Sequence, residues 1–176
     1  MAALFAASAA SADTWRSLAD QSTLEFIPSY EDTPLPSRFG RFEVRLDFDP
    51  DRPAEGRLAV TVWVASADMQ DAQLNAEIQA PGWFGVSLHP EARFESTDIT
   101  RRGDEFVAAG TLSLKGVRRE VRVPFRWQAD QDGARMQGAL ELDRSDFGIG
   151  DGEWAADQPI AHAVGVRFDI QLEASD

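Results

Sequence analysis

The side chains that most often perform catalysis or bind metals are scarce in this sequence. Its 176 residues include no cysteine, and His89 and His162 are the only histidines. Neither histidine stands in a His-x-x-x-His spacing, so no transition-metal site is expected. The 30 Asp and Glu residues show no spacing that singles out a pair for acid–base chemistry. The residues themselves therefore predict no catalytic centre, no metal site and no cofactor.

Two features argue against partners that carry phosphate. The run Gly148-Ile149-Gly150-Asp151-Gly152 lacks the following Lys-Ser/Thr and the strand-to-helix setting of a phosphate-binding loop, so a plain connection is expected there. The formal charge of -13, with 17 basic residues that nowhere cluster, is unsuited to nucleic acid. No nucleic-acid partner is expected.

The elements that must build any site are mostly β-strands, because apolar residues alternate with polar ones over most of the chain. In 42–48 the alternation is complete, and the segments 106–114 and 121–127 flank a turn at Lys115-Gly116-Val117-Arg118. Strands are expected at about 23–26, 42–48, 58–64, 92–96, 106–114, 121–127, 136–142 and 164–172.

One segment follows a helical period instead. Between Asp68, the expected N-cap, and Gln79, the apolar residues Leu74 and Ile78 are four apart. Pro81-Gly82 ends the segment. The chain is therefore predicted to be all-β, with eight antiparallel strands and one short helical insertion around 68–80.

Such strands form either a barrel with a ligand cavity or a filled sandwich. Gly110 and Gly138 fall on the apolar side of their strands. Glycines at these positions either leave room for a ligand on the inner wall of a barrel or only allow the strands to bend. The alternation of apolar residues alone does not distinguish a barrel with an apolar cavity from a fold with a filled core. Seven phenylalanines share the inner parity: Phe26, Phe42, Phe48, Phe94, Phe106, Phe125 and Phe168.

Residues 1–12 differ in composition from the rest of the chain. They carry no charge and end in Ala10-Ser11-Ala12, a small-x-small site typical of signal-peptide cleavage. We therefore expect a residual signal peptide at 1–12, a mature domain at 13–176 and export to the periplasm; an unstructured Ala/Ser-rich terminus is the alternative. No segment has the ~20 apolar residues of a membrane-spanning helix.

Eight short motifs follow one another from about Trp15 to Glu173. They are Trp15, Ser22-Thr23-Leu24-Glu25-Phe26, Phe39-Gly40-Arg41-Phe42, Phe48-Asp49-Pro50, Trp83-Phe84, Pro90-Glu91-Ala92-Arg93-Phe94-Glu95-Ser96, Gly110-Thr111-Leu112-Ser113-Leu114-Lys115-Gly116-Val117 and Asp143-Arg144-Ser145-Asp146-Phe147-Gly148-Ile149-Gly150. In this order they resemble the YceI-like family. The resemblance implies a lipocalin-like, eight-stranded periplasmic barrel that binds a long-chain isoprenoid or similar amphiphile. Many members have a histidine after the first strand motif, where this chain reads Ile27-Pro28-Ser29-Tyr30, so recognition of the ligand's head group is expected to differ.

With that resemblance, the sequence predicts a tunnel wall and a mouth. Trp83, Phe84 and Phe147 are expected near the mouth, where Arg144 is expected to pair with an acid. Gly138→Phe is expected to block ligand uptake while leaving the fold intact. The predicted tunnel residues are Phe26, Phe42, Val44, Leu46, Phe94, Leu112, Leu114, Gly138, Leu140, Val166 and Phe168.

Two other functions stay open at this stage. The protein could be an enzyme or redox accessory that acts on a lipid or quinone held in the barrel, or a filled sandwich used for protein contacts. The sequence leaves the identity of the lipid and the formation of a homodimer undecided.

Overall fold

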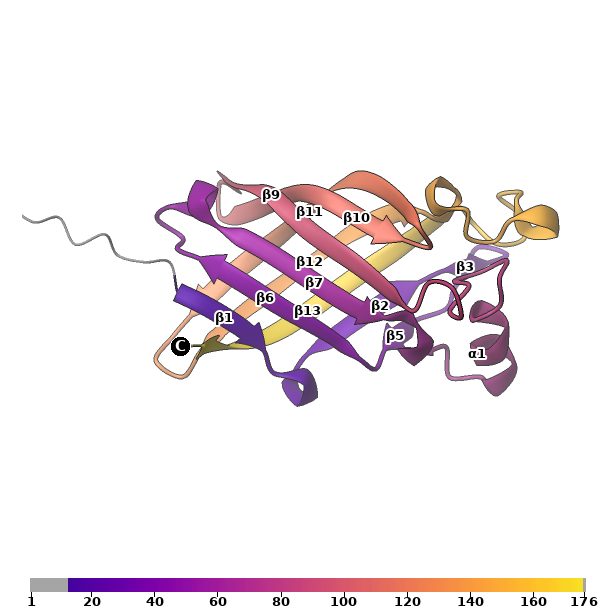
Figure 1. Cartoon of the computed structure of the whole chain (residues 1–176), viewed down its shortest axis with the longest axis horizontal. Helices are drawn as coiled ribbons and strands as arrows, with labels where there is room; N and C mark the ends of the chain where they lie inside the picture. Colours follow the sequence, from indigo (N-terminus) through magenta and orange to yellow (C-terminus); the bar gives the residue numbers. More distant parts are fainter. Residues whose placement is uncertain (1–12, 176) are drawn as a thin grey trace, which may run out of the picture.

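In the computed structural model, which describes residues 13–175, eight antiparallel strands close into a barrel (Figure 1). In order round the wall they are β1 (Asp13–Ser17), β6 (Phe42–Phe48), β7 (Arg57–Trp63), β9 (Glu91–Arg102), β10 (Glu105–Leu114), β11 (Val117–Ala129), β12 (Ala134–Asp143) and β13 (Ala163–Ser175). β13 returns to β1 and closes the ring. The predicted eight-stranded antiparallel barrel with one short helix is confirmed, whereas the expected signal peptide at 1–12 lies outside the described residues.

The strand that closes the barrel, β1, is not predicted by the sequence pattern. It pairs with β6 at one edge and with the end of β13 at the other. Trp15 is its only buried residue, so the strand offers no run of alternating apolar residues. The expected first strand, β2 (Thr23–Ile27), instead extends the wall beside β13, followed by β5 (Ser37–Phe39) and β8 (Ala67–Asp68).

One α-helix occurs within residues 13–175, α1 (Ala72–Ile78), and it lies at one end of the barrel (Figure 1). Its N-cap is Asp71, three residues after the expected Asp68, because the Asp71 carboxylate accepts hydrogen bonds from the backbone N–H groups of Gln73 and Leu74. The remaining elements are short: β3 (Ser29–Tyr30), β4 (Thr33–Pro34) and the 3-10 turns η1 (Ala19–Gln21), η2 (Pro53–Glu55), η3 (Val64–Ser66), η4 (Arg144–Phe147) and η5 (Gly152–Trp154).

The two inner-parity glycines mark close approaches of the backbone. A Cβ at Gly110 would collide with the carbonyl oxygen of Glu95, at a bulge between β9 and β10. A Cβ at Gly138 would collide with the carbonyl oxygen of Pro124 and with the ring of Phe168. The β11–β12 ladder has only four residue pairs and ends just before this contact, where Pro124 has no N–H to donate. These glycines therefore shape the wall.

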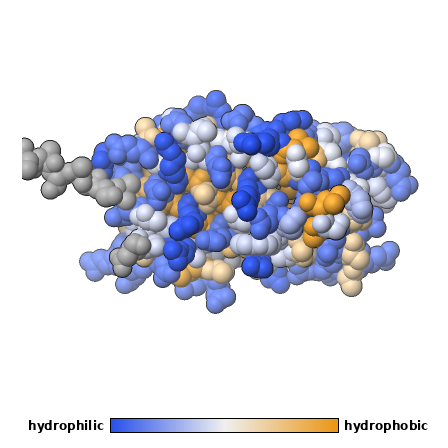
Figure 2. All heavy atoms as spheres, in the orientation of Figure 1, coloured by the Kyte–Doolittle hydropathy of each residue, from blue (hydrophilic) through white to orange (hydrophobic). Residues whose placement is uncertain are grey.

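The outer surface is mainly polar. Figure 2 shows a predominantly hydrophilic face with apolar side chains only in small groups. Among residues 13–175, the exposed large apolar side chains are Tyr30, Leu74 and Leu88, and Leu88 is 78% exposed. Within residues 13–175, no helix has the length and apolar character needed to cross a bilayer.

Candidate ligand cavity

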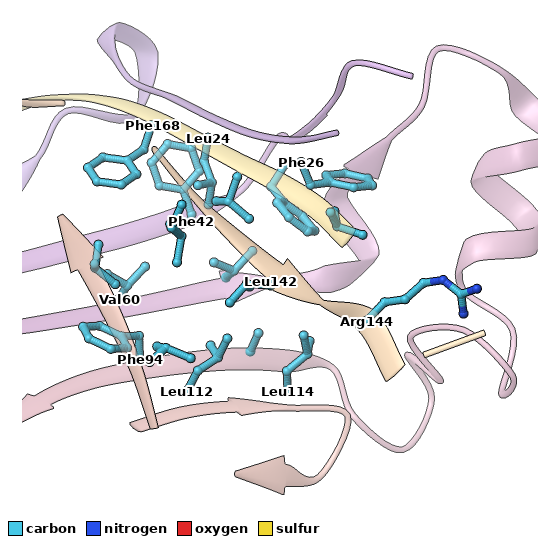
Figure 3. Close-up of a pocket in the computed structure, with 18 of the residues that line it drawn as sticks. Leu24, Phe26, Phe42, Val60, Phe94, Leu112, Leu114, Leu142, Arg144 and Phe168 are labelled. Atoms are coloured by element: carbon cyan, nitrogen blue, oxygen red, sulfur yellow. The ribbon is translucent and has the colours of Figure 1, made fainter. Parts of the chain in front are cut away.

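The inward side chains do not fill the barrel completely. They enclose a cavity of about 220 Å³, and every lining residue except Arg144 is apolar. Figure 3 shows Phe94, Val60 and Phe168 at one end of the row of lining residues and Arg144 at the other. The space is therefore suited to an apolar chain.

Eleven of the fourteen residues predicted for the tunnel and its mouth line this cavity. Whether they contact a ligand stays a prediction. They come from β2, β6, β9, β10, β12, β13 and the loop after α1: Phe26, Phe42, Val44, Trp83, Phe84, Phe94, Leu112, Leu114, Leu140, Val166 and Phe168.

The other three predicted residues do not line the cavity. Leu46 is fully buried outside the cavity, and Phe147 packs into the core from η4. Gly138 is covered by the ring of Phe168, which occupies the space that a side chain at position 138 would need. This geometry argues against the expected tolerance of the fold to Gly138→Phe, since the new side chain would strike both the Pro124 carbonyl and Phe168.

Sequence reasoning missed part of the lining. Leu24, Val60, Val123 and Leu142 have the same inward parity as the predicted residues and could have been included on that ground. Others come from loops, from the three-residue strand β5 or from α1, where no long alternating pattern signals their direction: Pro28, Phe39, Ile78, Ile149 and Ile160.

A cluster of five aromatic residues, here called the aromatic floor, closes the end of the barrel away from Arg144. Its members are linked by ring contacts with centroids 4.9 to 5.7 Å apart, mostly edge to face. None of them lines the cavity. The aromatic floor consists of Trp15, Phe48, Phe106, Phe125 and Trp127.

At the opposite end, Arg144 organises the segment 149–161. Its side chain is buried, and its guanidinium donates to six backbone carbonyls rather than to the acid that was predicted. These carbonyls belong to Ile149, Gly150, Trp154, Ala156, Ile160 and Ala161. A planar group with five N–H donors can connect so many acceptors, which an ammonium cannot.

The electrostatics of Arg144 follow from this burial. Loss of water lowers the pKa of its guanidinium, while Asp143 and Asp157 nearby raise it. An arginine remains charged under these conditions. Its Cζ lies 5.9 Å from the centroid of the Trp83 ring, so the charge also has an aromatic face as a neighbour.

Further contacts tie the 144–161 segment to neighbouring loops. The backbone N–H of Gly150 donates to the carbonyl of Gly82 at 2.8 Å. Lys115, in the β10–β11 turn, donates to the carbonyl of Gly148 and lies 3.8 Å from the Asp151 carboxylate. The mouth is therefore built mainly from polar backbone contacts.

The described residues offer little for a chemical reaction. Across 13–175, no group of three or more His, Asp or Glu side chains is arranged to hold a metal ion. His89 lies in the loop before β9, where its half-buried ring packs against the β10–β11 turn near Gly116. The cavity itself presents no carboxylate or imidazole among its lining residues.

The comparison with protein families agrees with the barrel and its cavity. A model described as the YceI-like domain matches residues 15–172. The chain belongs to the YceI-like family. Curated relatives include a UPF0312 protein of Photorhabdus laumondii, 34% identical over 83 residues, covering 47% of this chain and 43% of the relative. A UPF0312 protein of Pseudomonas aeruginosa is 30% identical over 121 residues, covering 65% and 63%. The matches thus span less than two thirds of these relatives.

The chain is also similar to solved structures in its three-dimensional fold. BcnA of Burkholderia cenocepacia matches with a TM-score of 0.85 and 28% identity, covering 88% of this chain and 98% of that one. A polyisoprenoid binding domain from Saccharophagus degradans matches with a TM-score of 0.73 and 16% identity, covering 92% and 98%. At that identity, the second match supports the fold alone.

Proposed function

We propose that this YceI-like protein binds a long-chain isoprenoid or similar amphiphile, such as a polyprenyl chain or quinone tail, inside the barrel. The observation that carries the proposal is the cavity, whose lining is apolar except for an arginine already bonded to six carbonyls. A domain of the same fold, from Saccharophagus degradans, is described as polyisoprenoid binding, so the fold is compatible with the proposed ligand class. We place this role in the periplasm on the composition of residues 1–12.

The hydrophobic effect supplies the affinity in this proposal. Each methylene that moves from water into the cavity contributes about 0.8 kcal/mol. Ordering of the chain and loss of its free motion oppose this gain. A hydrocarbon chain of several isoprene units is therefore favoured over a short or polar ligand.

Calorimetric titration of the purified protein with a polyprenol and with a long-tailed quinone tests the proposal. Leu140 and Ala139 provide a matched pair, since Leu140 lines the cavity and its neighbour Ala139 is exposed on the outside of β12. Leu140→Trp should abolish binding, whereas Ala139→Trp should leave it unchanged. Equal binding by both folded variants, or no binding of either lipid by the wild type, would contradict the proposal.

A further inference from the structure

The aromatic floor ends the cavity abruptly. Phe48 and Phe125 are each 1% exposed and Phe106 is 4% exposed, and the cavity does not extend between their rings. The guanidinium of Arg101 lies 5.5 Å from the centroid of the Phe106 ring and covers the floor from outside. A chain inside the barrel meets a wall at this end.

Cross-strand pairs locate the boundary between cavity and floor. Met136 lines the cavity, but its partner Trp127 does not. Leu58 lines the cavity, but its partner Leu46 does not. Because the residues of each pair are neighbours on the inner face, the cavity must end between them. Met136 and Leu58 therefore mark its deepest level.

The other end of the cavity carries the polar groups. Arg144 and the carbonyls that it holds lie there, with Lys115 and Asp151 close by. The lining residues at the floor end are apolar. An amphiphile that keeps its head hydrated must therefore enter with its tail toward the floor.

We propose that the aromatic floor sets the maximum length of the chain that the barrel can bury, so that the protein selects amphiphiles by chain length. This inference rests on the proposed lipid-binding function. Affinity should rise about fourfold with each methylene until the tail reaches the floor. Carbons added beyond that point stay outside the mouth and add nothing.

A series of straight-chain 1-alkanols of increasing length tests this inference by calorimetric titration. The wild type should show rising affinity up to one chain length and a plateau afterwards. Met136→Ala, which removes bulk beside the floor, should move the break to longer chains. Val60→Phe, which adds bulk near the same end (Figure 3), should move it to shorter chains.

Leu142→Ala is the matched control, because Leu142 lines the cavity on the Arg144 side of Val60 and Phe94, farther from the floor (Figure 3). It should lower affinity for all chain lengths without moving the break. Val60→Phe removes no buried group, so it keeps the test decisive if Met136→Ala fails to fold.

The outcomes separate the two proposals. If neither the alkanols nor a polyprenol binds, the lipid-binding function itself is wrong. If they bind but the affinity shows no break, or the break is the same in Val60→Phe as in the wild type, the floor does not limit chain length and only this inference is overturned.

Discussion

The two ends of the barrel are held by different forces. The aromatic floor consists of apolar rings in mutual contact, with Phe48 touching three other members of the cluster. The mouth depends on one buried arginine that gathers six backbone carbonyls. The same wall strands therefore support a sealed, densely packed end and an end made of loops.

Because of this difference, we expect the two ends to contribute unequally to the stability of the fold and to the entry of a ligand. Rings that fill a closed space contribute in proportion to the apolar area that they bury. Loops tied by hydrogen bonds contribute less, because water competes for the same groups. We therefore expect the floor to dominate global stability and the mouth to control local opening.

The largest predicted effect is a loss of stability at the floor. Phe125→Ala should reduce the free energy of unfolding by about 3–5 kcal/mol, because it leaves a hole among rings that cannot easily collapse. Urea denaturation measures this change. Phe26→Ala is the control, since Phe26 already borders the cavity, and it should cost about 2 kcal/mol, the contribution of burying the side chain without a new hole. Equal losses for both variants would contradict the distinction between the two ends.

The second prediction concerns Arg144. Arg144→Lys keeps the charge but has three donors for six carbonyls, so we expect a loss of about 2–3 kcal/mol. Hydrogen exchange should show faster exchange of the Gly150 amide, which donates to Gly82. Once the change in global stability is taken into account, the amides of Phe125 and its strand neighbours should exchange as slowly as in the wild type. Unchanged exchange at Gly150 would refute the role given to Arg144.

The third prediction tests the close approach of β11 and β12. Gly138→Ala should cost about 1–2 kcal/mol, because its Cβ meets the Pro124 carbonyl and the Phe168 ring. Gly165→Ala is the control, since its nearest neighbours lie at 3.7 and 4.0 Å, an ordinary contact distance. Thermal unfolding of the two variants compares them, and a neutral Gly138→Ala would show that the wall can relax there.

The smallest effect is expected at an ion pair on the outside of the barrel wall. Hydrogen bonds from Arg135 and Gln137 lower the pKa of Asp169. A carboxyl whose pKa is lower in the folded state stabilises the fold above its unfolded pKa, and this contribution disappears as the pH falls through the folded pKa. Asp169→Asn should therefore reduce stability slightly at neutral pH. The difference from the wild type should vanish in acid, and a difference that persists there would show that the charge is not its cause.

The two ends also explain what sequence could predict. Alternation placed Phe42, Phe94, Phe106 and Phe125 correctly on the inner face, because side-chain direction in a strand has a period of two. It could not distinguish the residues that line the cavity from those that form the floor. That distinction depends on the level of each residue along the barrel, which strand register determines.

The mouth was the least predictable region. The six carbonyls bound by Arg144 are backbone groups, which carry no signature in the sequence. Phe147 was expected to contact the ligand near the mouth, but it is buried in the core from the 3-10 turn that also holds Arg144 and does not line the cavity. Resemblance to the YceI-like family identified the motif around Arg144, yet the predicted acid partner was wrong.

Native mass spectrometry of the protein exported to a bacterial periplasm, followed by extraction of the lipids that co-purify, tests the lipid-binding function most directly. The predicted result is a stoichiometric complex with a long-chain isoprenoid or quinone, which is lost in Leu140→Trp. Protein that is free of lipid and also fails to bind added polyprenol and quinone would contradict the account.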